Sequence, residues 1–233
     1  MTPAIRPSRE EVYRRLKKGF NGLSGLFKIH LDDALLDEMG IDHVQIDLEQ
    51  ETQRGGPYFI SMSQERMASF NKRPAFHVEY DKEWSSSVWS FGASVDVHRE
   101  YQNQLYHSND KSPWCELDNS SWQYQCRQGS YEMLLQEHYS PYDDRGPRCQ
   151  SEWGLRNAFV AEGYPHRSCI SLAGIPDIKG LTRNELMIVT GMMISTMRAK
   201  GNENVLVVPL VLVSIFGIYA RIIQAHVALK ESG

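Results

Sequence analysis

The chain has 233 residues and a formal net charge of −4, with 41% hydrophobic and 23% charged residues. This length and balance are typical of one globular domain that can bury a core without disulfides or metals. An acidic total argues against a generally basic nucleic-acid binder, although it permits a local basic face. The first twenty residues lack the apolar stretch of a secretory signal. We therefore expect a cytoplasmic protein whose four cysteines stay reduced.

Two helices are predicted in the first forty residues. Ser8 and Glu11 have the spacing of a capping box, so the first helix should begin near Arg9. A second, short helix is predicted over the segment LDDALLDEMG, because Asp32 is a good N-cap residue and Gly40 a good helix stop.

Three regions with different patterns follow. Residues 41–98 are predicted to form an antiparallel meander of strands, since segments such as HVQIDLE alternate apolar and polar side chains. Residues 99–139 are more polar and helical in pattern, and a helix is predicted over 122–139. Residues 140–180 are interrupted by glycines and prolines, so they are predicted as a long loop or lid.

The last region, residues 181–233, predicts a helix followed by strands. Thr182 and Glu185 have capping-box spacing ahead of the segment NELMIVTGMMISTMRAK, which ends at Gly201.

The run VLVVPLVLVSIFGIYA comes next and carries no charge. Its sixteen residues are fewer than the roughly twenty that a membrane helix needs. Its β-branched residues favour strands, so we predict two strands that turn near Gly217, the first buried on both faces. Pro209 should lie at a bulge or a sheet margin, because it cannot donate a ladder hydrogen bond.

The order of these elements is typical of the α+β class. We expect a single soluble α+β domain over residues 1–233, with an antiparallel meander, packed helices and a buried C-terminal strand pair.

Basic residues are concentrated on the first predicted helix of this acidic chain. They are Arg9, Arg14, Arg15, Lys17 and Lys18. One interpretation is a face that binds nucleic-acid phosphates. The other is an ordinary solvated helix surface, which is usually charged.

Carboxylates gather in the predicted meander. Glu79 and Asp81 are two residues apart in a predicted strand, so their side chains would share a face of the sheet. Such groups, with Glu132 on the following helix, can transfer protons or bind a cationic substrate. The alternative is a solvent-facing surface without function. The sequence has neither a Walker motif nor a CxxC pair, so no metal or cofactor is predicted.

Three segments carry a resemblance to known proteins. They are EYDKEWSSSVWSFGASVDVHREY (79–101), CRQGSYEMLLQEHY (126–139) and NVLVVPLVLVSIFGIYARIIQAH (204–226). Together they resemble a group of small fungal proteins, and the chain looks similar to the arginine-containing cyclodipeptide synthases. That family is associated with an Asp-Asp-x-x-Glu pattern. Its nearest counterparts here, Asp32-Asp33 and Asp143-Asp144, lack a glutamate at that spacing.

The resemblance implies a transferase of fungal secondary metabolism. It would join arginine from arginyl-tRNA to an amino acid from a second aminoacyl-tRNA, as a diketopiperazine, without ATP, metal or cofactor. Glu79, Asp81 and Glu132 would bind the guanidinium and move protons, and Ser24 is the candidate nucleophile. The five basic residues of the first helix would bind the tRNA.

Two alternative functions stay open at this point. A degenerate metal-dependent nuclease-like domain would also combine basic and acidic groups. A non-enzymatic protein-interaction module would use residues 140–180 to contact a partner. The second amino acid and the oligomeric state are left open.

Overall fold

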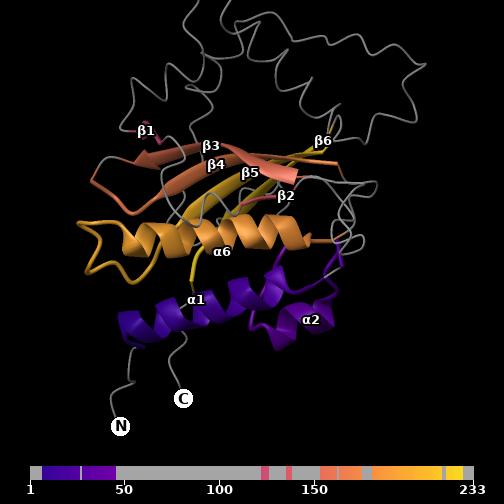
Figure 1. Cartoon of the computed structure of the whole chain (residues 1–233), viewed down its shortest axis with the longest axis horizontal. Helices are drawn as coiled ribbons and strands as arrows, with labels where there is room; N and C mark the ends of the chain where they lie inside the picture. Colours follow the sequence, from indigo (N-terminus) through magenta and orange to yellow (C-terminus); the bar gives the residue numbers. More distant parts are fainter. Residues whose placement is uncertain are drawn as a thin grey trace, which may run out of the picture.

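The structure is a computed structural model of the chain. It describes residues 7–26, 28–45, 122–125, 135–137, 153–161, 163–174, 180–216 and 219–227. Its helices in these ranges are α1 (Arg9–Ser24), α2 (Asp33–Glu38) and α6 (Arg183–Arg198). Its strands are β1 (Trp122–Gln125), β2 (Gln136–Glu137), β3 (Trp153–Ala161), β4 (Arg167–Ala173), β5 (Leu210–Phe216) and β6 (Tyr219–Ala225). Figure 1 shows how they are arranged.

The strands form one mixed sheet in the order β1-β3-β4-β5-β6, with β2 also paired to β3. The β3–β4 and β5–β6 pairs are antiparallel hairpins, whereas β4 and β5 run parallel. Parallel neighbours need a long crossover connection, and α6 lies in that connection. The helices and this mixed sheet confirm the α+β class.

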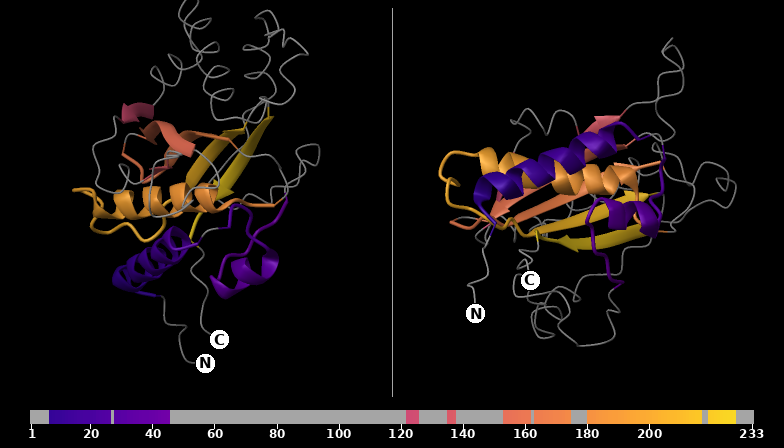
Figure 2. Two further views of the ribbon diagram at one scale, coloured as in Figure 1. Left: turned by 45° about the vertical axis from the view of Figure 1, so that its right-hand side comes forward. Right: turned by 90° about the horizontal axis from the view of Figure 1, so that it is seen from below.

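Helix α6 lies at the centre of the molecule, between the sheet and α1 (Figures 1 and 2). All of its residues except Arg183, Ser195 and Arg198 are buried. A helix that is apolar around its whole circumference must be covered on all sides. The segment LMIVTGMMI has no polar stripe, and this explains why α6 is enclosed.

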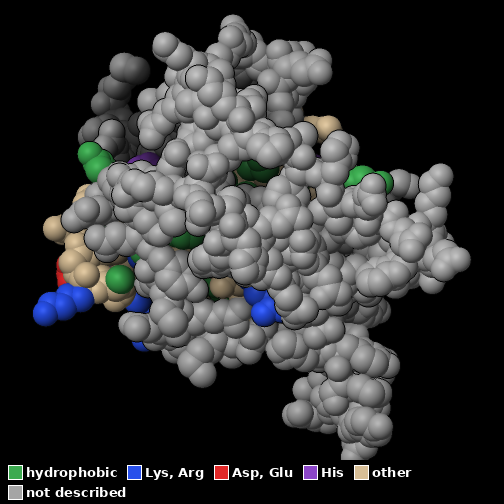
Figure 3. All heavy atoms as spheres, turned by 90° about the horizontal axis from the view of Figure 1, so that it is seen from above, with side chains coloured by type: hydrophobic (Ala, Val, Ile, Leu, Met, Phe, Trp, Pro, Cys, Tyr) green, Lys and Arg blue, Asp and Glu red, His purple; other side chains and the backbone are tan. Residues whose placement is uncertain are grey.

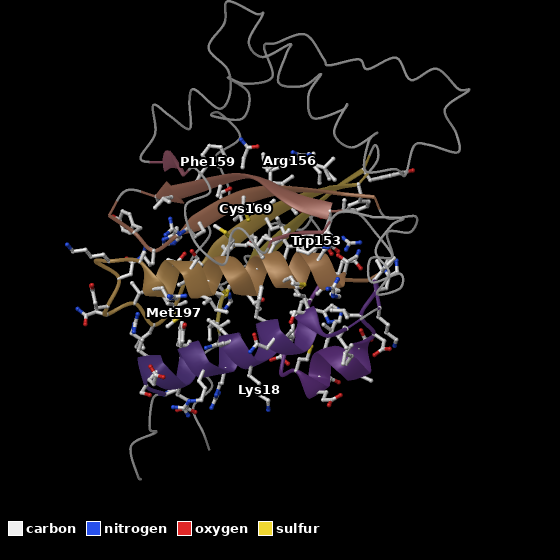
Figure 4. The ribbon with its side chains drawn as sticks, in the orientation of Figure 1. Lys18, Trp153, Arg156, Phe159, Cys169 and Met197 are labelled. Carbon is white, nitrogen blue, oxygen red and sulfur yellow. The ribbon has the colours of Figure 1, made fainter. Side chains whose placement is uncertain are left out.

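The sheet presents one face to α6. The side chains of Trp153 and Cys169 point into the layer between sheet and helix, whereas Arg156 and Phe159 lie on the opposite side (Figure 4). Figure 3 views the molecule from that opposite side, where the described hydrophobic side chains that are visible lie in separate small areas.

Reciprocal arginines connect α1 and α6 at both ends. The guanidinium of Arg9, the first residue of α1, donates to the carbonyl of Met197 in the last turn of α6. Arg183, the first residue of α6, donates through Nε to the carbonyl of Leu23 in the last turn of α1, at 2.8 Å. Carbonyls in a last helical turn lack the usual partner four residues on, so each arginine supplies a donor to one of them, and the Leu23 carbonyl also accepts from the Leu26 amide at 3.1 Å. The two contacts show that the helices run antiparallel.

A glycine lets α6 approach its neighbours closely. A Cβ atom at Gly191 would lie 2.8 Å from Cδ2 of Leu135 and 3.1 Å from Cε2 of Phe20. Both distances are shorter than ordinary van der Waals contact, so an alanine here would force the side chains of Leu135 and Phe20 to shift.

The predicted ends of the helices are confirmed. The Ser8 hydroxyl accepts from the amide of Glu11 at 3.2 Å, and the Asp32 carboxylate accepts from the amide of Leu35 at 3.0 Å. Gly40, with φ of 69°, follows α2 in the left-handed conformation that favours glycine. The capping box of α6 is also present.

The predicted C-terminal strand pair is confirmed as β5 and β6, but its burial is less complete than expected. Alternate residues of β5 are buried, so one face is covered and the other is half-buried. Strand β6 is exposed or half-buried throughout and ends the strand order of the described sheet. Pro209 directly precedes β5, at the sheet margin, and its carbonyl accepts from the Arg167 amide at 2.9 Å.

Two predicted segments are wrong where the structure describes them. The helix predicted over 122–139 contains strands β1 and β2, and the loop predicted over 140–180 contains the hairpin β3–β4. Both β1 and β2 pair with β3, so partners distant in sequence determine their conformation. One of the glycines that favoured a loop, Gly163, lies in the turn between β3 and β4 with φ of 74°.

The predicted meander lies outside the described residues, except for 41–45, which form no strand. Within the described ranges, no helix has the length and hydropathy needed to span a membrane.

Candidate functional site

The first candidate site is the solvent face of α1. Four of the five basic residues predicted to bind tRNA are exposed there: Arg14, Arg15, Lys17 and Lys18. The opposite face of α1 is buried through Val12, Phe20 and Leu23. The Lys18 side chain points away from α6 and from the sheet (Figure 4). Because the apolar face is anchored on α6, the cations are held on the outside of the molecule.

Most of this positive charge is unpaired within the described residues. Arg15 forms an ion pair with Glu11, one turn earlier. Arg14, Lys17 and Lys18 form no ion pair with any described side chain. Exposed cations without an acidic partner remain available to an anionic ligand.

Arg9 occupies a different place from the other four. It is half-buried at the start of α1, where its guanidinium contacts the Met197 carbonyl. Its charge also acts on Glu203, whose pKa is lowered first by hydrogen bonds from the Gly201 amide and its own amide and then by Arg9. The described contacts of Arg9 therefore join α1 to α6, and its role in tRNA binding stays a prediction.

The predicted nucleophile Ser24 is exposed at the end of α1. Its hydroxyl donates to the carbonyl of Asn21, one turn earlier, at 2.8 Å. This bond is an ordinary helix-end contact, so a catalytic role for Ser24 stays a prediction. The other three predicted catalytic residues, Glu79, Asp81 and Glu132, lie outside the described residues, so their role stays a prediction.

The second candidate site is a buried ion pair at the N-terminus of α6. Glu185 is fully buried, and its Oε2 atom accepts from the amide and the hydroxyl of Thr182 at 2.9 and 2.8 Å. The same oxygen accepts from the guanidinium of Arg221, on β6, at 2.8 Å. Three donors, one of them charged, therefore meet at one oxygen of this buried side chain.

Arg221 is held by further contacts. Its guanidinium donates to the carbonyl of Gly180 at 2.6 Å and lies over the Phe216 ring, 5.4 Å from the ring centre. These contacts fix edge strand β6 to the start of α6.

Sequence reasoning identified Glu185 only as a capping residue and Arg221 only as part of a strand pattern. The available signal was a single arginine in an otherwise uncharged strand, together with a glutamate at the start of a helix without a polar stripe. These two charges of opposite sign, each beside apolar residues, could have suggested an ion pair.

Two further buried groups lie in the layer between sheet and α6. Arg167 is 4% exposed, and its Nε donates to the hydroxyl of Thr196 at 2.6 Å. Burial raises the pKa of the Cys169 thiol well above its ordinary value, so this thiol is a poor nucleophile. Among the described residues, no group of three or more His, Cys, Asp or Glu side chains could hold a metal ion.

Comparison with protein-family models, with curated proteins and with solved structures finds no match to this chain.

Proposed function

We propose that the protein is an aminoacyl-tRNA-dependent cyclodipeptide synthase that joins arginine, delivered by arginyl-tRNA, to a second amino acid. The observation that carries the proposal is the cationic face of α1, formed by Arg14, Arg15, Lys17 and Lys18. In a chain with a net charge of −4, this local excess of positive charge favours a polyanionic ligand such as the tRNA phosphate backbone.

The arrangement of these cations suits a strand of phosphates. Arg14 and Lys18 are four residues apart, so they follow one another along the helix by about 6 Å. The helix that carries them is anchored on buried α6, so the cations are displayed on a rigid element. Binding would therefore need little ordering of the protein backbone.

The proposed chemistry needs no energy-supplying cofactor, because the aminoacyl ester of tRNA is already activated. The first aminoacyl group would pass to the Ser24 hydroxyl, breaking one ester bond, forming another and returning the proton to the tRNA 3′ or 2′ oxygen. The α-amine of the second aminoacyl group would then attack this ester and release the serine. The α-amine of the first amino acid would then attack the ester that joins the second amino acid to its tRNA. This attack forms the second amide bond, closes the ring and releases the second tRNA. Glu79, Asp81 and Glu132 are the proposed proton acceptors and guanidinium ligands.

Production of a cyclic dipeptide tests the activity directly. The gene would be expressed in a bacterial host, and extracts would be searched by mass spectrometry for a new arginine-containing diketopiperazine. We expect such a product from the unaltered protein and none from an Asp81→Asn variant with equal soluble yield. An unchanged metabolite profile, from a host that contains folded protein and charged tRNA, would contradict the proposal.

Charge reversal on α1 tests the binding face separately. Lys18→Glu is expected to weaken binding of arginyl-tRNA and to reduce the slope of log K against log salt by about 1, since one phosphate contact is lost. Lys200→Glu is the matched control, because Lys200 is an exposed lysine outside α1. If the two substitutions had equal effects, α1 would not be part of the tRNA-binding site. That result would not exclude the proposed activity.

The same preparations separate the proposal from a metal-dependent nuclease. A nuclease would cleave the tRNA and would lose that activity with a chelator. The proposed transferase should leave the tRNA chain intact and should form its product equally well with the chelator present.

A further inference from the structure

Strand β6 forms one edge of the described sheet. It pairs with β5 along all seven of its residues without a register shift, and no described strand pairs with its other side. In Figure 2 the two yellow strands, β5 and β6, lie at one margin of the sheet. The backbone N–H and C=O groups along an unpaired edge can bind a further strand.

The side chains of β6 are uncovered and mostly apolar. Tyr219 is 43% exposed and Ile222 is 59% exposed, so β6 contributes two of the large hydrophobic residues that are exposed in the described part of the chain. Ala220 and Gln224 are exposed as well. This edge therefore presents both apolar side chains and backbone to a partner.

One apolar row crosses the sheet and ends at this edge. Ile170 on β4 pairs with Val213 on β5, and Val213 pairs with Ile222 on β6. Ile170 is buried, Val213 is half-buried and Ile222 is exposed, so the cover decreases toward the edge. Arg221 points toward Glu185 on α6, so Ile222, the next residue, points to the opposite face of the sheet. An apolar residue placed beside Ile222 would extend the row and remove it from water.

The usual protection of an open edge is missing from β6. Proteins protect such edges with prolines, bulges, or charges that a new strand would bury unpaired. The strand contains no proline, and its pairing with β5 has no bulge. Its one charged residue, Arg221, already forms an ion pair with Glu185 at 2.8 Å. A new strand would therefore bury no unpaired charge of β6.

We propose that β6 is the interface of a symmetric homodimer, in which it pairs antiparallel with β6 of a second copy around Ile222. A twofold axis through the central residue of the strand places Ile222 opposite Ile222 of the second copy. The two apolar rows then join into one, and the two sheets become continuous. The other facing pairs are Tyr219 with Ala225, Ala220 with Gln224, and Arg221 with Ile223.

A second copy is the occupant that the sequence of β6 fits. No two charges of like sign face each other in this register, and the central contact is between two exposed apolar residues. A charged peptide would find no unpaired charge on β6 to select it. One strand pair is small beside the roughly 1,200–2,000 Å² buried in stable interfaces, so we expect a dimer that dissociates on dilution. In dilute protein, β6 then behaves as a peripheral strand of the monomer.

The dimer does not depend on the proposed synthase activity. None of the residues of β6 belongs to the proposed catalytic or tRNA-binding groups. Failure of the dimer would leave the synthase proposal standing, and the absence of a cyclic dipeptide would leave the dimer standing.

Analytical ultracentrifugation over a wide range of protein concentration, up to millimolar, tests the association. We expect a monomer in dilute solution and a dimer in concentrated solution. Ile222→Lys should raise the dissociation constant at least about tenfold, because two lysines would face each other across the axis. Val44→Lys is the matched control, since Val44 is 68% exposed outside the sheet, and it should leave the dissociation constant unchanged.

Folding of both variants is checked by circular dichroism, and an exposed position tolerates lysine well. A folded protein that stays monomeric at every concentration would overturn the proposal. So would a dimer that Ile222→Lys does not weaken.

Disulfide cross-linking tests the register. In a glutathione buffer, Ile222→Cys should cross-link with a second copy of itself, because the two positions face each other. Ala220→Cys and Gln224→Cys should cross-link poorly alone but well when mixed, because position 220 faces position 224. The unaltered protein, with its four native cysteines, gives the background. Efficient cross-linking of Ala220→Cys with itself would indicate parallel pairing and would overturn the antiparallel dimer.

Discussion

Single residues decide how the start of α6 is joined to the edge of the sheet. Glu185 receives the donors of its own N-cap, and Arg221 supplies the one charged donor from β6. The glutamate is fully buried, whereas the arginine side chain is 21% exposed. The buried carboxylate is therefore the member of the pair that depends more on its partner, because water cannot replace the lost donor.

Removal of Arg221 should therefore destabilise the protein strongly. Arg221→Met leaves a buried anion without its counter-charge, and we expect the free energy of unfolding to fall by about 3 kcal/mol. The double variant Glu185→Gln/Arg221→Met removes both charges and should recover a substantial part of this loss. Urea denaturation of the unaltered protein, of the single variants Glu185→Gln and Arg221→Met, and of the double variant measures the coupling. A single variant as stable as the unaltered protein would show that the pair contributes little.

At the scale of elements, the antiparallel pair α1–α6 combines arginine contacts at both ends with a close approach in the middle. Arg9 and Arg183 satisfy last-turn carbonyls of the opposite helix. Between them, Gly191 lies against the side chains of Leu135 and Phe20. The packing of α1 on α6 thus includes a tight contact at one glycine.

Alanine substitution of two glycines tests this packing. Gly191→Ala should lower the free energy of unfolding by about 1 kcal/mol, because overpacking a buried contact outweighs the better helix propensity of alanine. Gly19→Ala in α1 is the matched control, since a Cβ atom there would meet no atom within 4 Å and alanine should stabilise that helix by up to about 1 kcal/mol. Thermal unfolding of both variants gives the comparison. If both alanine substitutions stabilised the protein equally, the neighbours of Gly191 would have moved to make room for the added methyl group.

At the scale of the whole described fold, α6 is covered by the sheet on one side and by α1 on another, whereas α2 and β6 lie at the periphery. Buried central elements open only when the whole protein unfolds, and peripheral elements open locally. The layers therefore predict a gradient of local stability from the centre of the molecule outward.

Amide hydrogen exchange should reveal this gradient. We expect peptides from α6 to exchange most slowly among the described elements, and those from α2 and β6 to exchange faster by several orders of magnitude. Mass spectrometry of exchanged, protease-digested protein measures the rates. Exchange of α6 as fast as that of α2 would contradict the three-layer arrangement.

Local signals in the sequence were sufficient where a structure depends on neighbours along the chain. Ser8, Asp32 and Thr182 marked the starts of three helices, because an N-cap hydroxyl or carboxylate acts within one turn. The uncharged run after α6 likewise indicated a strand pair. For the candidate site, the sequence identified the cations of α1, since amphipathic spacing alone separates Lys18 from the buried side of its helix.

Only the tertiary structure decided the features that depend on distant partners. Strands β1 to β4 were not predicted, because their glycines and polar residues suggest loops or helices. Pairing with neighbouring strands in space outweighs these local preferences. The same holds for the contact of Arg221 with Glu185 and for the bridge between His30 and Thr182, which join residues 36 and 152 positions apart. Hydrophobic periodicity shows which side chains must be buried, but only the packed fold determines which polar groups are buried together.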